Sequence, residues 1–211
     1  MLWVLVVLAL APIASAEVVD RIAIIAGRQV ITELQVDEEL RVTAFLNKQP
    51  IERDPKRRRD AAARLVEQLL IEQEVQVSRY PLPDGEDVAK YVVQIRQSVG
   101  PASNFNDALV KYGLTEDMLR DHLALQLTTL RFIEFRFQPE VDISDAEIES
   151  AYERETANWR AHHSGLPPTI EASRDALRKA LLEERVDEEL DAWLQQRRKR
   201  ISIVYRDASL E

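Results

Sequence analysis

Hydrophobic residues recur at intervals of three and four along most of the chain, the spacing of one face of an α-helix. Glycine and proline fall between these periodic segments, where they end helices. The pattern therefore predicts a mainly α-helical fold. Its helices are expected over residues 33–47, 57–79, 86–99, 105–112, 145–156 and 170–200, with one more beginning after Thr115.

Three local signatures mark the starts of helices. Thr32 with Gln35 and Ser144 with Glu147 match the capping box, in which each residue bonds the backbone N–H of the other. Thr115 precedes two acidic residues, which favour the positive end of a helix dipole. We expect a helix to begin directly after each of these caps.

Strand patterns occur only near the two ends of the chain. Residues 18–25 and 30–31 are β-branched and apolar, and they predict a short hairpin or extended arm. Residues 201–205 alternate as a strand that could pair with this hairpin. Residues 49–55 and 158–168 are expected to be irregular. The fold class is thus mainly α, with a small strand arrangement joining the N- and C-terminal regions.

The first residues match a cleavable export signal. Residues 2–11 are an unbroken apolar run, and Ala14 and Ala16 form a small-x-small site ahead of Glu17. The run is shorter than the ~20 residues that span a bilayer. No Lys or Arg precedes it, and the alternative is a buried N-terminal strand. We predict a signal peptide over residues 1–16, export, and no stable membrane insertion after its removal.

Composition narrows the classes of partner. The chain has 28 Lys and Arg residues against 37 Asp and Glu, a net charge of −9, so nucleic acid is an unfavourable partner. Its 45% of hydrophobic residues is ordinary for a folded soluble domain. It has no cysteine, which excludes disulfides, thiolate catalysis and cysteine-based zinc sites.

Residue patterns that carry chemistry are almost absent. His122 lies inside a predicted helix, as a surface or packed side chain, and His162 and His163 are adjacent in a predicted loop. No metalloprotease, hydrolase or nucleotide-binding motif occurs. Two basic runs, at residues 56–59 and 197–200, fit a solvated loop and a helix C-terminus. We therefore expect no catalytic residues, no metal and no cofactor.

The order of these segments resembles the SurA family of periplasmic chaperones. Residues 18–32 are similar to the family's opening strand pair, with Gly27 in place of the usual Asn, and residues 65–73 to its "LI-x-x-L-L-I-x-Q" helix. The "ISDxEI" phrase matches residues 143–148, and the terminal "W-L" helix and strand match residues 193–205. A further similar segment covers residues 114–125.

This resemblance implies an ATP-independent periplasmic chaperone that binds unfolded or partly folded exported proteins, such as outer-membrane proteins in transit. The family's parvulin isomerase domain, of roughly a hundred residues, cannot fit within residues 157–169. We therefore expect one domain over residues 17–211, with an N-terminal part (17–156), a short connector (157–169) and a C-terminal helix and strand (170–211). The alternatives are an isomerase with a different site, and an adaptor for one envelope partner.

A chaperone of this kind needs an apolar groove between helices. Apolar positions on the predicted helix faces are the candidates for this groove, with ordinary core packing as the alternative. The candidate client-binding residues are Leu69, Val92, Ile95, Leu119, Leu123 and Phe132.

Overall fold

The computed structural model describes residues 20–78, 80–100 and 102–210. The predicted signal peptide, with Ala14, Ala16 and Glu17 at its cleavage site, lies outside the described residues. The elements follow in the order β1 (Ile22–Ala26), β2 (Gln29–Thr32), α1 (Glu33–Leu46), α2 (Pro55–Val77), α3 (Gly85–Val99), α4 (Ala102–Lys111), α5 (Glu116–Arg136), η1 (Gln138–Glu140), α6 (Asp145–His162), α7 (Ile170–Arg200), β3 (Ile203–Tyr205) and η2 (Ala208–Leu210).

The mainly α-helical fold class is confirmed, and so is the small sheet that joins the two ends of the chain. The sheet is antiparallel with the order β2-β1-β3. Ile25 of β1 is opposite Val30 of β2 on one side and Val204 of β3 on the other. Gly27 has a φ of +61° in the two-residue turn between β1 and β2, a conformation that glycine adopts without strain.

The predicted helix caps are also confirmed. Thr32 and Ser144 each form a complete capping box with the third residue of the helix. The Thr115 side chain accepts a hydrogen bond from the Met118 N–H. Each side chain pairs a backbone donor that the first helical turn leaves free, so the local sequence alone sets these starts.

Several helix boundaries differ from the prediction, and α4 begins at Ala102 rather than residue 105. Helix α2 begins at Pro55 rather than residue 57, because Asp54 caps it and proline suits the first helical position. Helix α6 continues to His162, so the prediction of irregular chain from residue 158 is wrong for its first five residues. Gly165 and the prolines after it are the first helix-ending residues beyond residue 156. His162 is thus helical and not part of a loop.

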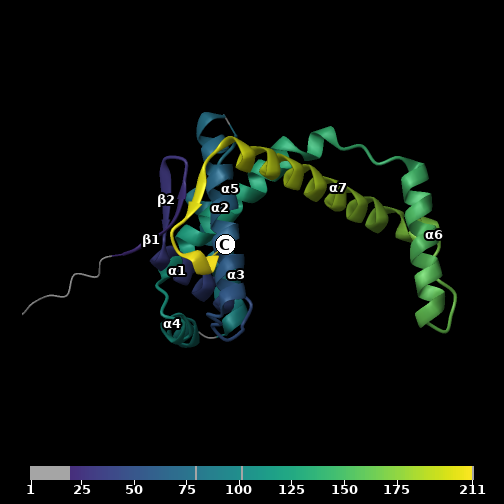
Figure 1. The fold of residues 1–211 in the computed structure, drawn as a ribbon. Coiled ribbons are helices and arrows are strands. Elements are labelled where there is room, and N and C mark those ends of the chain that lie inside the picture. Colours follow the sequence, from purple (N-terminus) through teal and green to yellow (C-terminus); the bar gives the residue numbers. More distant parts are fainter. Residues whose placement is uncertain (1–19, 79, 101, 211) are drawn as a thin grey trace, which may run out of the picture.

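The molecule has two regions, which we call the body and the arm. The body is residues 20–139 and 197–210, and the arm is residues 140–196, which hold α6, the connector and most of α7. Figure 1 shows α7 leaving the body and α6 lying across its far end. At about 1.5 Å per residue, the 31 residues of α7 span about 46 Å.

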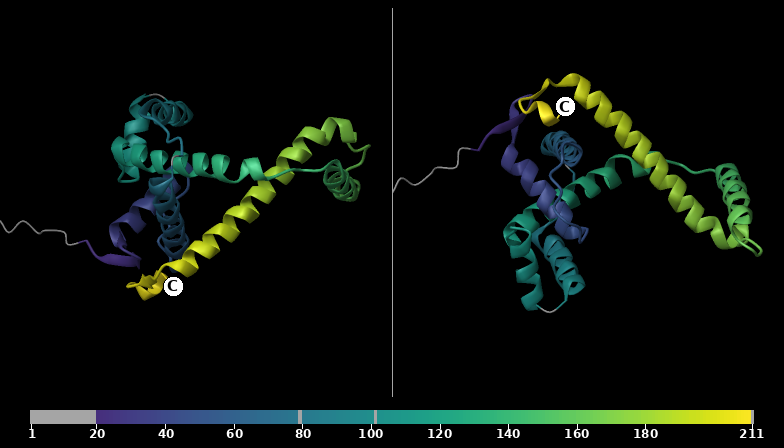
Figure 2. Two further views of the ribbon diagram at one scale, coloured as in Figure 1. Left: turned by 90° about the horizontal axis from the view of Figure 1, so that it is seen from above. Right: turned by 60° about the horizontal axis from the view of Figure 1, so that its bottom comes forward.

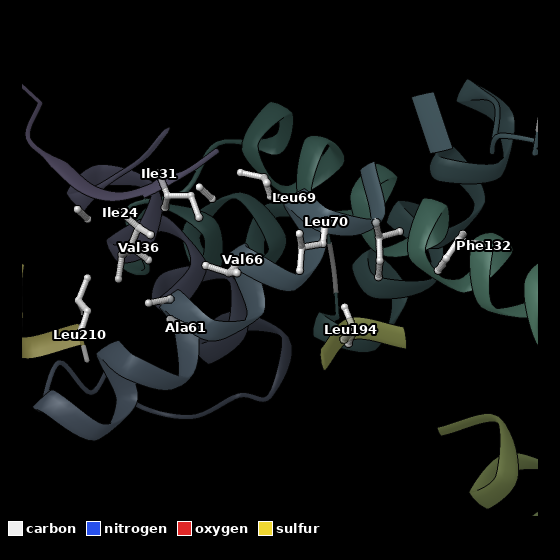
Figure 3. Close-up of a cluster of buried hydrophobic side chains, with 14 of the residues drawn as sticks. Ile24, Ile31, Val36, Ala61, Val66, Leu69, Leu70, Phe132, Leu194 and Leu210 are labelled. Carbon is white, nitrogen blue, oxygen red and sulfur yellow. The ribbon is translucent and has the colours of Figure 1, made fainter. Parts of the chain in front are cut away.

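Buried apolar side chains form three clusters. The largest joins the sheet, α1, α2, the end of α5 and the root of α7. Figure 3 shows it running from Ile24 and Ile31, past Val66 and Leu70 of α2, to Phe132 of α5. A second cluster joins α1, α3, α4 and α5. The third is small and lies between α6 and α7, around Ile148.

Candidate functional site

The predicted client-binding residues are core residues in this structure. Leu69 and Phe132 belong to the largest cluster, and the other four belong to or pack against the second. All are buried except Ile95, which is partly buried. They do not form an exposed groove, because helical periodicity marks the buried face of a helix whether a core or a ligand covers it. The ordinary-core alternative matches their burial.

An open apolar cleft lies instead where the arm leaves the body. Helices α2, α5 and α7 form three sides of a triangle at this point (Figure 2). The cleft between them has a volume of about 430 Å³. It is lined by Arg64, Glu67, Gln68, Ile71, Gln126, Thr129, Leu130, Leu190 and Leu194.

The cleft combines a buried apolar floor with exposed apolar walls. Ile71 of α2 and Leu194 of α7 are buried beneath it. Leu130 of α5 is 50% exposed, and Leu190 of α7 is partly buried. Covering a leucine completely is worth about 1.5–3 kcal/mol, so a ligand side chain that covers the exposed half of Leu130 gains about 1 kcal/mol. Each such contact is weak.

Polar side chains surround these leucines. Gln68 and Gln126 carry amide groups that can both donate to and accept from a peptide backbone. Glu67 of α2 accepts a hydrogen bond from Arg198 of α7 at 2.8 Å, and Arg197 of α7 forms an ion pair with Glu74 of α2. These ion pairs hold the C-terminal end of α7, where the arm joins the body, against α2. They hold two sides of the cleft together.

A buried polar network lies behind the cleft and joins three helices. Glu39 of α1 accepts a hydrogen bond from Arg64 of α2 at 2.7 Å. Its other oxygen lies 3.3 Å from Nδ1 of His122 on α5. Burial alone would raise the pKa of the Glu39 carboxyl, but hydrogen bonds from His122 and Arg64 outweigh it and lower the pKa below its ordinary value. Glu39 is therefore held as a carboxylate.

His122 is thus a packed residue, one of the two possibilities that its helical position left open. Its partner Glu39 was missed from the sequence. One signal could have found it: Glu39 lies three residues after the buried Val36, on the apolar face of α1. A charged residue on a buried face requires a partner, and His122 and Arg64 are the partners here.

The net negative charge of the chain is concentrated in the arm. Residues 140–196 hold 15 acidic and six basic residues, a net charge of −9, and the remaining residues of the chain hold equal numbers of each. A cavity of about 610 Å³ between α6 and α7 is lined mainly by such polar side chains, including Glu147 and Arg185, which pair at 2.9 Å. This cavity has a charged lining, whereas the cleft at the root of the arm has an apolar floor.

Comparisons with known protein families and curated proteins found no similar protein. No protein-family model matches the chain, and no curated protein matches it. Within the described part of the chain, no helix is long and apolar enough to cross a membrane. In the same residues, no three metal-binding side chains gather at one point. Fold and cleft together define a mainly α-helical protein with a projecting acidic arm and an open apolar cleft at its root.

Proposed function

We propose that this chain is an ATP-independent holdase, which binds unfolded exported polypeptides in the periplasm and releases them without chemical change. The observation that carries the proposal is the cleft between α2, α5 and α7, where exposed Leu130 lies beside a floor of buried Ile71 and Leu194. Apolar burial has no directional requirement, so such a cleft suits clients of many sequences.

The size of the cleft suits weak and reversible binding. Two or three client side chains covering its leucines gain a few kcal/mol, and part of this offsets the ordering of the client. A micromolar complex needs about −8 kcal/mol in total. We therefore expect affinities of about micromolar or weaker, and correspondingly fast exchange.

The acidic arm adds a second supporting feature. A net charge of −9 concentrated in one projecting region repels other copies of the same complex. This repulsion keeps a complex soluble while it carries exposed apolar segments. The resemblance to SurA-like chaperones and the predicted export signal support the periplasm as the compartment, with outer-membrane proteins in transit as clients.

The direct test is light scattering of a refolding outer-membrane barrel protein, with and without the mature chain from Glu17 and in the absence of ATP. Leu130→Glu places a charge in the cleft, and Leu166→Glu is the matched control, because Leu166 is 94% exposed in the connector of the arm. We expect the parent and the control to suppress aggregation at near-stoichiometric amounts, and Leu130→Glu to lose most of this effect.

Three results would contradict the proposal. The folded parent chain could fail to suppress aggregation, and a pull-down with one stoichiometric partner would then favour a dedicated adaptor. Equal suppression by Leu130→Glu and the parent would exclude the cleft as the binding site. Turnover of an X-Pro peptide would indicate an isomerase. A holdase has no catalytic step and would not produce this result.

A further inference from the structure

A second groove lies along a neighbouring face of α2, beside the edge of the sheet. It has a volume of about 340 Å³, and Gln68 borders both this groove and the cleft. Side chains from β2, α1, α2 and α5 surround it. The groove is lined by Arg28, Gln29, Val30, Ile31, Gln35, Leu65, Gln68, Leu69, Glu72 and Leu125.

The backbone of β2 is open along this groove. β2 is an outer strand of the sheet, and no described residue pairs with its free edge. The residues beside a two-residue turn exchange hydrogen bonds and the next pair does not, so the N–H and C=O of Val30 point toward the free edge. The Thr32 N–H is taken by the Gln35 side chain. Val30 therefore offers one donor and one acceptor to a neighbouring strand.

The groove also contains a carboxylate that no described cation pairs with. Glu72 of α2 is half-buried, and no described basic side chain forms an ion pair with it, although Arg28 lines the same groove. Burial raises the pKa of the Glu72 carboxyl above its ordinary value. The next residue, Gln73, donates a hydrogen bond to the Gln29 side chain at 2.6 Å, which places this turn of α2 beside β2.

These features define one kind of occupant. An extended segment satisfies the free backbone groups of Val30, its apolar side chains cover Leu65 and Leu125, and a basic side chain reaches Glu72. We propose that the groove beside β2 binds an extended peptide segment of a partner protein that carries a Lys or Arg among apolar residues. This site is separate from the cleft and does not depend on holdase activity there.

Binding can be measured with a fluorescent nine-residue peptide of alternating apolar and polar residues and a central Lys, titrated against the full mature chain. Two matched peptides replace the Lys with norleucine or with Glu. We expect the Lys peptide to bind about five to ten times more tightly than the norleucine peptide, and the Glu peptide to bind most weakly.

The variant that isolates the carboxylate is Glu72→Gln, which keeps the shape of the side chain and removes its charge. We expect it to abolish the preference for Lys over norleucine while it leaves the affinity for the norleucine peptide unchanged. Glu134→Gln, at an exposed position of α5, is the control and should keep the preference. Circular dichroism melts of both variants verify that they are folded.

Backbone methylation of the peptide tests the strand pairing without any change to the protein. N-methyl groups on one alternate set of amides block the edge facing β2, and those on the other set face away from it. We expect one set to weaken binding by at least about fivefold and the other to have little effect.

Four results would overturn the proposal. One is equal binding of both methylated peptides, and another is an unchanged Lys preference in Glu72→Gln. A third is no binding of the Lys peptide to the folded parent at millimolar concentration. The fourth is self-association of the chain that excludes the peptide, which would assign the edge to a second copy. If Leu130→Glu loses aggregation suppression but still binds the peptide, the result bears on the holdase cleft and leaves the β2 groove proposal unaffected.

Discussion

The body and the arm are stabilised in different ways. The body holds two large clusters of buried side chains, with 20 acidic and 22 basic residues, whereas the one cluster that lies wholly in the arm has four buried residues, and the arm has a net charge of −9. Burial of apolar surface is the main stabilising force in folding, so the body has much the larger share of it. The arm therefore depends on its root for its position relative to the body.

That root is an aromatic cluster with ion pairs beside it. The ring of Trp193 on α7 lies 5.0 Å from that of Phe132 and 6.4 Å from that of Phe137. Arg198 of α7 adds its bond to Glu67. The far end of the arm depends on the small cluster around Ile148. The same helical periodicity therefore produces a large core in the body and only a small cluster at the far end of the arm.

The largest expected effect comes from Phe132→Ala, which would weaken the body and the root together. Phe132 is fully buried, and its ring contacts those of Tyr80, Phe137 and Trp193. We expect a loss of about 3–5 kcal/mol in the free energy of unfolding, measured by urea denaturation. A loss below 1 kcal/mol would show that the cluster is not the centre of stability.

Ile148→Ala should act on the arm alone. Ile148 is fully buried between α6 and α7, and its truncation should cost about 2–4 kcal/mol locally. We expect faster amide hydrogen exchange in α6 with unchanged exchange in α2, and no change with Leu166→Ala. Equally faster hydrogen exchange in α2 would show that the body and the arm unfold as one cooperative unit, and the two regions would then not differ in stability.

A third prediction concerns the polar network of the body. Glu39→Gln should cost about 1–3 kcal/mol at pH 7, because it removes the charge that Arg64 and His122 contact. The folded pKa of Glu39 lies below the ordinary 4.5, so its contribution is complete above pH 4.5 and is lost as the pH falls through the folded pKa. Chemical denaturation at several pH values should show the two proteins converging in acid. A constant difference would contradict this assignment.

The smallest effect should come from Glu72→Gln and have the opposite sign. The pKa of Glu72 is raised by burial, so its charged form destabilises the fold at neutral pH, and the destabilisation disappears in acid. Since the side chain is half exposed, we expect a gain of only a few tenths of a kcal/mol at pH 7, from thermal melts. A clear loss would indicate that Glu72 has a stabilising partner within the fold. A stabilising substitution that weakens peptide binding is typical of a functional residue.

Much of the fold could be predicted from local signals. Thr32 and Ser144 set helix starts through side chains that act within three residues, and the alternation in residues 201–205 predicted the strand that pairs with β1. The end of α6 was placed too early, because no glycine or proline occurs between residue 156 and Gly165 and the helix continues to His162.

The candidate sites were not predictable in the same way. Leu69 and Leu130 are both leucines on helical faces, yet Leu69 is buried in the core and Leu130 is half exposed in the cleft. Their places in the packed fold separate them, because Leu69 belongs to the core cluster beside β2 whereas Leu130 borders the opening between α2, α5 and α7. Likewise, Glu72 is one of several acidic residues on α2, and its lack of a cation depends on which elements pack beside it.

The sequence by itself determined the helices, their caps, the strand segments near the two ends and the acidic character of residues 140–196, since these follow from interactions within a few residues or from composition. The tertiary structure alone decided which apolar side chains remain exposed, where the cleft and the β2 groove open, and that Glu39 meets His122 and Arg64. Burial and pairing between distant segments depend on how whole helices pack against one another, and periodicity marks the packed face without naming its partner.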